Sequence, residues 1–175
     1  MRKYFFILLV VSYMSYTDIL VDISQQRLFV LDNRGTLIVS YPISSSYFGE
    51  GQVENSFKTP LGKHVIKQKI GSDASKNIIF KERINTGRYA EIHHTDYDSD
   101  EDHVTSRILW LEGLEEGFNK GGNVDSFNRY IYIHGTPEEG LIGKKASHGC
   151  IRMFNHDVIE LYDLVQEGTK VNIVL

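Results

Sequence analysis

Cysteine is almost absent from this sequence of 175 residues, because Cys150 is the only one. A single thiol excludes an internal disulfide framework, and it leaves no Cys-x-x-Cys pair of the kind used in structural zinc sites. Proline is also scarce, with 3 residues, and no low-complexity linker divides the chain. We therefore expect a single domain, and at this length one domain can bury a substantial core.

The sequence also lacks a hydrophobic run long enough to span a bilayer. The longest run follows two basic residues and extends from Tyr4 to about Val11, whereas a membrane-spanning helix needs ~20 apolar residues. A basic start before a short apolar run is typical of a secretory signal. We interpret residues 1–16 as a signal peptide or N-terminal membrane anchor and residues 17–175 as the folded domain. A buried first strand is the alternative interpretation.

Positive charge is neither abundant nor clustered. The chain has 19 Lys and Arg residues against 23 Asp and Glu residues, for a net charge of −4. Because no basic stripe runs through the sequence, we expect no nucleic-acid partner. An apolar fraction of 41% is typical of an ordinary globular protein.

What the sequence does contain is a strong strand pattern. Apolar and polar residues alternate over residues 19–41, with turn chemistry in "DNRG" at residues 32–35, which predicts an antiparallel meander. Further strand-like segments lie at residues 59–71, 129–135 and 170–175. The polar middle of the chain, residues 72–128, is predicted to form insertion loops around a site.

One segment has helical spacing. Asn155 is a good N-cap residue type, Gly168 is a good stop signal, and four apolar residues between them share one face: Val158, Ile159, Tyr162 and Val165. The predicted fold class is therefore mainly β, with one late helix and long insertion loops.

Two segments resemble binding motifs without matching them. "HHTDYDSDEDH" has aspartates at the early spacing of a calcium hand: Asp96, Asp98, Asp100 and Asp102. Glu101 replaces the required glycine and Arg107 replaces the bidentate glutamate, so we interpret this segment as a solvated loop. "NKGGN" at residues 119–123 lacks the spacing of a phosphate-binding loop.

The strongest chemical signal surrounds the single thiol, in "SHGCIRM" at residues 147–153. A thiol with a pKa of ~8.5 is mostly protonated near neutral pH, so a nucleophilic cysteine needs a nearby base. His134 ends a predicted strand, which would hold such a base rigidly. The carbonyl of Gly135 could bind the second ring nitrogen and fix the tautomer of His134.

The residues next to Cys150 complete a possible acyl-transfer site. Gly149 allows close backbone approach, and the amides of His148, Gly149 and Cys150 could converge on a developing oxyanion. The guanidinium of Arg152 suits a carboxylate.

Each of these features has a simpler interpretation. Cys150 could be a small buried hydrophobe, and Arg152 could pair with an acid such as Asp157. A three-ligand zinc site formed by His134, His148 and Cys150 is also possible.

The pairing of "HG" at residues 134–135 with "SHGCIRM" resembles the signature of the L,D-transpeptidase catalytic domain family, also called YkuD-like. The segments "ILVDISQQRLFVLDNRG", "KTPLGKHVI" and "NHDVIELYDLVQEGTKVNI" resemble other parts of the same family, from about Thr17 onward. His64 departs from the pattern, since the family usually has an aromatic residue there. The resemblance implies a β-sandwich or barrel-like fold.

Carried over by this resemblance, Cys150 is the nucleophile and His134 is its base, oriented by the carbonyl of Gly135. The backbone at His148, Gly149 and Cys150 lies at the oxyanion site. Ser147 and His148 support the pocket, and Arg152 meets a substrate carboxylate.

The resemblance also implies a function. Cys150 would attack the stem tetrapeptide of peptidoglycan, release D-alanine and form a thioester, which an amine of a second stem resolves as a 3-3 cross-link. A lipoprotein lysine is another acceptor, and water would make the enzyme an L,D-carboxypeptidase. The chemistry requires no cofactor, and carbapenem-type β-lactams would be inhibitors. The expected location is the periplasm or cell envelope after export, with an inner-membrane anchor as a variant. A metal-dependent hydrolase and a non-catalytic wall-binding module are the alternatives from other classes.

Overall fold

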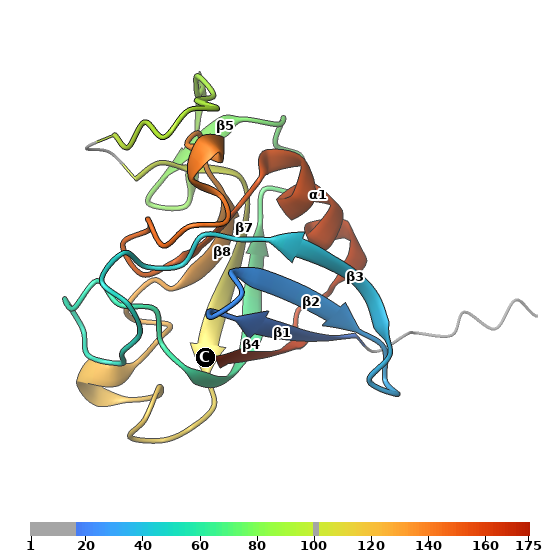
Figure 1. Cartoon of the computed structure of the whole chain (residues 1–175), viewed down its shortest axis with the longest axis vertical. Coiled ribbons are helices and arrows are strands. Elements are labelled where there is room, and N and C mark those ends of the chain that lie inside the picture. Colours follow the sequence, from blue (N-terminus) through green and yellow to red (C-terminus); the bar gives the residue numbers. More distant parts are fainter. Residues whose placement is uncertain (1–16, 100–101) are drawn as a thin grey trace, which may run out of the picture.

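The computed structural model of the protein describes residues 17–99 and 102–175, so the predicted signal or anchor at residues 1–16 lies outside the described residues. In the described residues, ten strands form one mixed sheet with a single α-helix (Figure 1). The strands are β1 (Asp18–Asp22), β2 (Arg27–Leu31), β3 (Leu37–Pro42), β4 (Gly62–Ile70), β5 (Ile78–Lys81), β6 (Ile84–Tyr89), β7 (Val104–Gly113), β8 (Tyr132–Gly135), β9 (Ile151–Met153) and β10 (Lys170–Val174). The helix is α1 (Asn155–Leu164), and two short 3₁₀ helices are η1 (Gly122–Val124) and η2 (Glu139–Leu141). The prediction of a mainly β fold with one late helix is confirmed.

The first three strands form the predicted antiparallel meander. β1 pairs with β2 and β2 pairs with β3, in the order of the chain. The carboxylate of Asp32 accepts hydrogen bonds from the amides of Arg34 and Thr36, which closes the turn between β2 and β3. β1 also pairs in parallel with β10, so the two ends of the domain lie side by side.

The middle of the chain differs from the prediction of irregular loops, because residues 72–128 contain β5, β6 and β7. β7 is among the most buried strands of the sheet and pairs with β4, β5 and β8. Its sequence does not alternate, since a strand covered on both faces reads as a continuous apolar run. Arg107 lies within it, donating from Nη1 to the carbonyls of Ala74 and Ser106.

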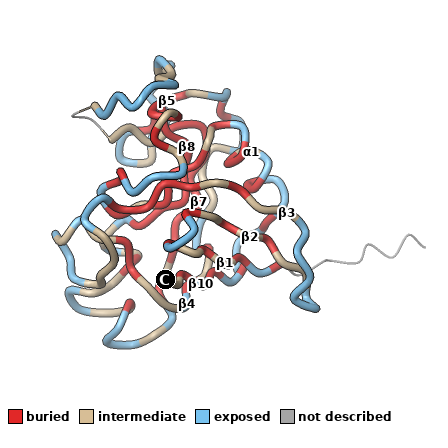
Figure 2. Tube along the Cα trace, in the orientation of Figure 1, coloured by how far each residue is buried: buried red, intermediate tan, exposed pale blue. Residues whose placement is uncertain are grey.

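The main core lies between the sheet and α1, which packs against β7 and β8 (Figure 1). The buried part of the trace in Figure 2 runs through β7 and β8, whereas the outer loops are exposed. Val158 and Leu161 of α1 are fully buried in this core. No helix within residues 17–99 and 102–175 has the length and apolarity needed to cross a membrane.

The predicted cap of the helix is wrong by one residue. Phe154 occupies the N-cap position, and Asn155 is the first helical residue. The buried side-chain amide of Asn155 instead donates to the carbonyl of Thr136 at 2.7 Å and to the carboxylate of Glu139 at 2.9 Å. Asn155 therefore ties the start of α1 to the segment that follows β8. The helix also ends at Leu164, before the predicted stop at Gly168.

Strand pairing brings the two halves of the sequence signature together. β8 pairs antiparallel with β7 and parallel with β9, in a register that places His134 opposite Arg152. Cys150 immediately precedes β9 and packs against a second, smaller core that includes Trp110 and Tyr132. The site therefore rests on two paired strands, which are more rigid supports than loops.

Candidate active site around Cys150

The thiol of Cys150 lies at the start of β8. The backbone amide of Tyr132 lies 3.4 Å from Sγ and donates to it, and the thiol donates to the carbonyl of Tyr130, also at 3.4 Å. Burial raises the pKa of Cys150 to about 12, so the thiol is protonated at neutral pH. A nucleophilic attack from this position therefore needs a base to take the proton as the sulfur attacks.

His134 has the properties of such a base. Its side chain is buried in β8, and its Nδ1 atom lies 2.8 Å from the carbonyl oxygen of Gly135. A carbonyl can only accept a hydrogen bond, so Nδ1 carries the hydrogen and Nε2 is left as the basic nitrogen. Burial lowers the pKa of His134, so the ring is neutral near pH 7.

Gly135 occupies a position where a side chain does not fit. A Cβ atom added there would lie 2.6 Å from Oδ1 of Asn155 and 2.8 Å from the carbonyl oxygen of Thr105. The absence of a side chain allows β7, β8 and the start of α1 to approach closely. The close packing of these elements also fixes the position of the Gly135 carbonyl, which binds Nδ1 of His134.

The loop before Cys150 is held by its own hydrogen bonds. The hydroxyl of Ser147 is buried, donates to the carbonyl of Cys150 at 2.6 Å and accepts from the amide of Gly149 at 3.3 Å. Gly149 has a φ of +121°, a conformation that favours glycine. Ser147 therefore shapes the loop from beneath, and its buried hydroxyl faces the chain rather than the solvent.

The three predicted oxyanion amides differ in their hydrogen bonding. The amide of His148 donates to Asp102 at 3.2 Å, and the amide of Gly149 donates to Ser147. The amide of Cys150 donates to no acceptor within the part of the chain that the structure describes. Of the three, it is the one free to bind a developing negative charge.

The ring of His148 is partly exposed and has a different environment from that of His134. Its Nδ1 lies 3.2 Å from a carboxylate oxygen of Asp102, and this hydrogen bond raises the pKa of His148. His148 is thus the histidine more readily protonated, whereas His134 stays neutral to lower pH. This contrast favours His134 over His148 as the base.

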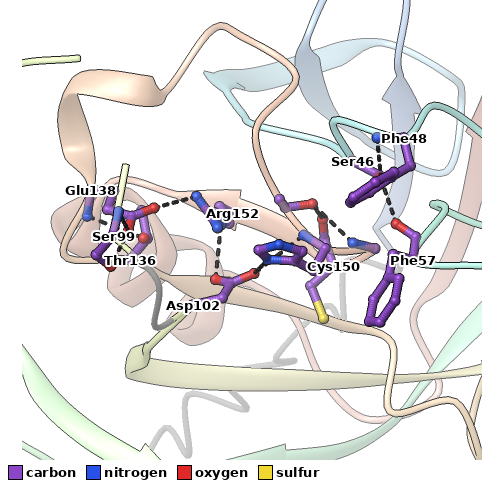
Figure 3. A network of polar contacts seen from close by, with 12 residues as sticks. Ser46, Phe48, Phe57, Ser99, Asp102, Thr136, Glu138, Cys150 and Arg152 are labelled. Carbon is purple, nitrogen blue, oxygen red and sulfur yellow. Dashed lines mark hydrogen bonds and ion pairs between the residues drawn. The ribbon is translucent and has the colours of Figure 1, made fainter. Parts of the chain in front are cut away.

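Arg152 has partners other than those that the sequence suggested. Its side chain is 1% exposed, with Nε 2.9 Å from Asp102 and Nη1 2.6 Å from Glu138. Figure 3 shows Arg152 between these two carboxylates. The acid considered as a partner on sequence grounds, Asp157, instead lies 3.0 Å from His156. The guanidinium of Arg152 is therefore buried between two acids, and its Nη2 atom has no hydrogen-bond partner among the described residues.

Asp102 is the residue that sequence reasoning missed. Burial opposes its ionisation, but the hydrogen bond from His148 and the charge of Arg152 outweigh burial and hold the pKa of Asp102 well below its usual range. One carboxylate thereby connects the loop before Cys150 to the buried arginine after it. The aspartate spacing gave the only sequence signal, and it pointed to calcium chemistry.

Asp96 and Asp98, earlier in the same segment, are exposed. Asp96 forms an exposed ion pair with Lys144 at 2.7 Å, while Asp100 and Glu101 lie outside the described residues. Within residues 17–99 and 102–175, no group of three or more His, Cys, Asp or Glu side chains is arranged to hold a metal ion.

An aromatic surface adjoins the loop before Cys150. The rings of Phe48 and Phe57 lie 5.8 Å apart, and each lies 6.0 Å from the ring of His148. Phe57, His148 and Tyr130 also line a cavity of about 250 Å³. A partly apolar cavity next to the loop that carries Cys150 would suit an extended ligand.

Known proteins resemble the chain in sequence and in fold. A protein of Bacillus subtilis assigned as the L,D-transpeptidase YkuD is 58% identical over 60 residues, which cover 31% of this chain and 37% of that protein. An L,D-transpeptidase of Mycobacterium smegmatis has the same fold, with a TM-score of 0.57 at 18% identity, over 92% of this chain and 59% of that one. An L,D-transpeptidase of Mycobacterium tuberculosis, solved with a faropenem-derived adduct, has a TM-score of 0.56 at 17% identity, over 92% and 61%.

The matched segments span about a third of the curated YkuD protein and about three fifths of the two solved chains. The decisive match is to the family itself, because the L,D-transpeptidase catalytic domain family matches residues 16–173, nearly the whole sequence. The chain therefore belongs to the L,D-transpeptidase catalytic domain family.

Proposed function

We propose that this chain is a cysteine-dependent L,D-transpeptidase that acts on peptidoglycan stem peptides, with residues 17–175 as its catalytic domain. One observation carries the proposal. A buried, neutral His134, whose tautomer is fixed by Gly135, lies on the strand whose first amide contacts the thiol of Cys150. The base lies on β8 and the thiol immediately precedes its paired strand β9, an arrangement that suits a nucleophile activated by a nearby base.

The first chemical step follows from the two protonation states. Sγ of Cys150 attacks the carbonyl carbon between the third residue of the stem and its terminal D-alanine. The thiol proton passes to Nε2 of His134 as the carbon–sulfur bond forms. The carbonyl oxygen becomes an oxyanion, which the free amide of Cys150 is positioned to bind.

The second step releases the leaving group. His134 returns the proton to the amide nitrogen of D-alanine as the carbon–nitrogen bond breaks, and a thioester on Cys150 remains. An amine of a second stem then attacks the thioester, giving its proton to His134 and forming the 3-3 cross-link. The thiol recovers its proton from His134 at the end of the cycle, so the protons balance.

The same thioester chemistry supports proposals about partners. A β-lactam carbonyl is an acyl donor of the same kind, and a related transpeptidase of Mycobacterium tuberculosis carries a faropenem-derived adduct. We expect carbapenem-type β-lactams to acylate Cys150. A lipoprotein lysine would serve as an alternative amine. Since the proposed substrate lies outside the inner membrane, the proposal also implies export, with residues 1–16 as the signal or anchor.

The proposal is tested by incubating the purified chain with disaccharide-tetrapeptide and analysing the products by mass spectrometry. We expect a cross-linked dimer that is lighter than two monomers by one D-alanine, and no product from the Cys150→Ser variant. A tripeptide monomer alone would instead make the chain an L,D-carboxypeptidase. Activity that survives in Cys150→Ser but is lost with a chelator would replace the proposal with a metal-dependent hydrolase. Unchanged tetrapeptide without an adduct on Cys150 would favour a non-catalytic module.

A further inference from the structure

The hairpin formed by β5 and β6 ends in a tight turn with unusual residues. Lys81 pairs with Ile84, so the turn consists of Glu82 and Arg83 alone. Their φ angles are +50° and +68°, the left-handed region that two-residue hairpin turns require and that glycine or asparagine normally fills. An unfavourable backbone conformation retained at two successive residues points to a role for the turn.

The turn holds the guanidinium of Arg83 against three aromatic side chains. Its Cζ lies 4.9 Å from the ring centroids of both Trp110 and Tyr130, and Nη1 donates to the hydroxyl of Tyr132 at 3.2 Å. Stacking and the hydrogen bond together restrict a side chain that would otherwise be mobile.

Two tyrosines connect Arg83 to Cys150. The same two tyrosines that hold Arg83 also contact Sγ of Cys150, Tyr132 through its amide and Tyr130 through its carbonyl. The guanidinium is therefore separated from the thiol by no more than two hydrogen bonds and the length of one tyrosine. Arg83 therefore borders the residues that surround Sγ.

The charge of Arg83 is also available. Within the described residues it has no ion pair with a carboxylate, and one of its five N–H groups donates to the protein. The nearby arginines differ. Arg152 is buried between two acids, and Arg129 donates to the carbonyls of Gly51, Gln52 and Lys58. Arg83 is thus a fixed cation beside the site with donors to spare.

We propose that Arg83 binds a carboxylate of the stem-peptide substrate beside Cys150, the role that the sequence suggested for Arg152. This inference rests on the proposed function, because a stem peptide supplies the carboxylate. Two sources share that chemistry. The donor tetrapeptide carries its terminal carboxylate on D-alanine, one residue from the scissile carbonyl, and an acceptor stem carries carboxylates near its amine.

The test compares the wild-type chain with Arg83→Gln, Arg83→Lys and the control Lys81→Gln, which removes an exposed positive charge from the same hairpin. Each is assayed with disaccharide-tetrapeptide ending in a free D-alanine carboxylate or in its amide. Alkylation of Cys150 by neutral iodoacetamide shows whether the thiol and its surroundings are intact. D-Alanine release reports the donor step, and dimer formation reports the acceptor step.

We expect Arg83→Gln to lower kcat/KM by about 10- to 100-fold, the effect of losing a charged hydrogen bond. Alkylation should stay at the wild-type rate, Lys81→Gln should behave as wild type, and Arg83→Lys should fall between. If the donor carboxylate is bound, replacing it by the amide should lower wild-type kcat/KM as much as Arg83→Gln does. The amide should then cause no further loss in the Arg83→Gln variant. If the acceptor carboxylate is bound, dimer formation falls, while the release of the first D-alanine in a single turnover with enzyme in excess does not.

Two failures are distinguishable. A wild-type chain that leaves the tetrapeptide unchanged overturns the proposed function and this inference together. Wild-type turnover with an unaffected Arg83→Gln variant overturns this inference alone. Equal losses of alkylation and turnover in Arg83→Gln would also overturn it, because the hairpin would then support the thiol rather than the substrate.

Discussion

The Nδ1 atom of His134 lies 2.8 Å from the carbonyl oxygen of Gly135, the next residue in the chain. In the proposed mechanism this short local contact takes the place of the acidic third member of a triad. It fixes the tautomer but adds no negative charge next to the ring. The pKa of His134 therefore stays low, because burial outweighs the effects that would raise it.

The low pKa predicts the acid limb of the pH profile. His134 acts only when neutral, so kcat/KM should stay high as the pH drops below the ordinary histidine value of 6.5 and fall only once His134 is protonated. His134→Ala should abolish turnover. His148→Ala should leave the acid limb where it is. The pKa of His148 is raised, so its protonation cannot account for a fall in activity that begins only at low pH. An active His134→Ala variant beside an inactive His148→Ala variant would reverse the assignment of the base.

Gly135→Ala tests the close approach of β7, β8 and α1. The new Cβ would meet Asn155 Oδ1 at 2.6 Å and the carbonyl of Thr105 at 2.8 Å. Overpacking of this kind costs about 1–3 kcal/mol of folding free energy. We expect a lower urea midpoint together with a larger loss of kcat, because the shift moves the carbonyl that orients His134. A variant with wild-type stability and kcat would show that the site tolerates the shift.

Asp102→Asn tests the carboxylate that connects His148 to Arg152. The charge of Asp102 contributes to raising the pKa of both Cys150 and His148. Its removal should shift the pH dependence of Cys150 alkylation downward and return the titration of His148, followed by NMR, toward an ordinary value. Asp96→Asn is the matched control, because that carboxylate pairs with a surface lysine. If Cys150 and His148 titrate identically in Asp102→Asn and Asp96→Asn, Asp102 does not act on either group.

Arg152→Met tests whether Arg152 acts by holding the fold. Removing one partner of a buried ion pair costs about 3–5 kcal/mol, because the remaining charge is left uncompensated. Glu138 is fully buried, so the penalty should appear as a reduced free energy of unfolding in urea. Arg88→Met, at an exposed position, is the control. Wild-type stability with a raised KM would return Arg152 to the role of substrate ligand.

Sequence reasoning located the parts of the site that are close together in the chain. "SHGCIRM" and "HG" are compact segments on paired strands, so their residue types and order already indicate a nucleophile and a base. Asp102 is different, since it contacts His148 across 46 residues of sequence. Only the packing of an acidic loop against the site reveals it.

The same limit applies to the fold. The meander and the helix follow from alternation and helical spacing, which are local signals. β7 was missed because burial on both faces removes the alternation that identifies a strand, and because Arg107 interrupts its apolar run. Arg83 gave no sequence signal, since its role depends on three aromatic rings brought together by β7 and the residues around β8.

The pH dependence of stability is the last prediction, and it concerns His64, the position where the family usually has an aromatic residue. His64 is buried, with Nδ1 3.0 Å from the carbonyl of Gly62 and Nε2 2.9 Å from the hydroxyl of Ser126. Burial lowers its pKa from 6.5 to about 4. The unfolded chain therefore binds a proton at this residue at a higher pH than the folded chain does.

The sign of the effect follows from this difference. His64 contributes stability that is fully present above pH 6.5 and is lost as the pH falls toward about 4, amounting to roughly 3 kcal/mol. His64→Phe removes the titrating group and should flatten this part of the pH dependence, whatever its effect on absolute stability at pH 7. Urea unfolding of both chains at several pH values between 7 and 4 measures the two slopes. Equal slopes for the wild type and His64→Phe would mean that His64 is protonated equally in the folded and unfolded chains. The ring would then be less buried in solution than its contacts with Gly62 and Ser126 require.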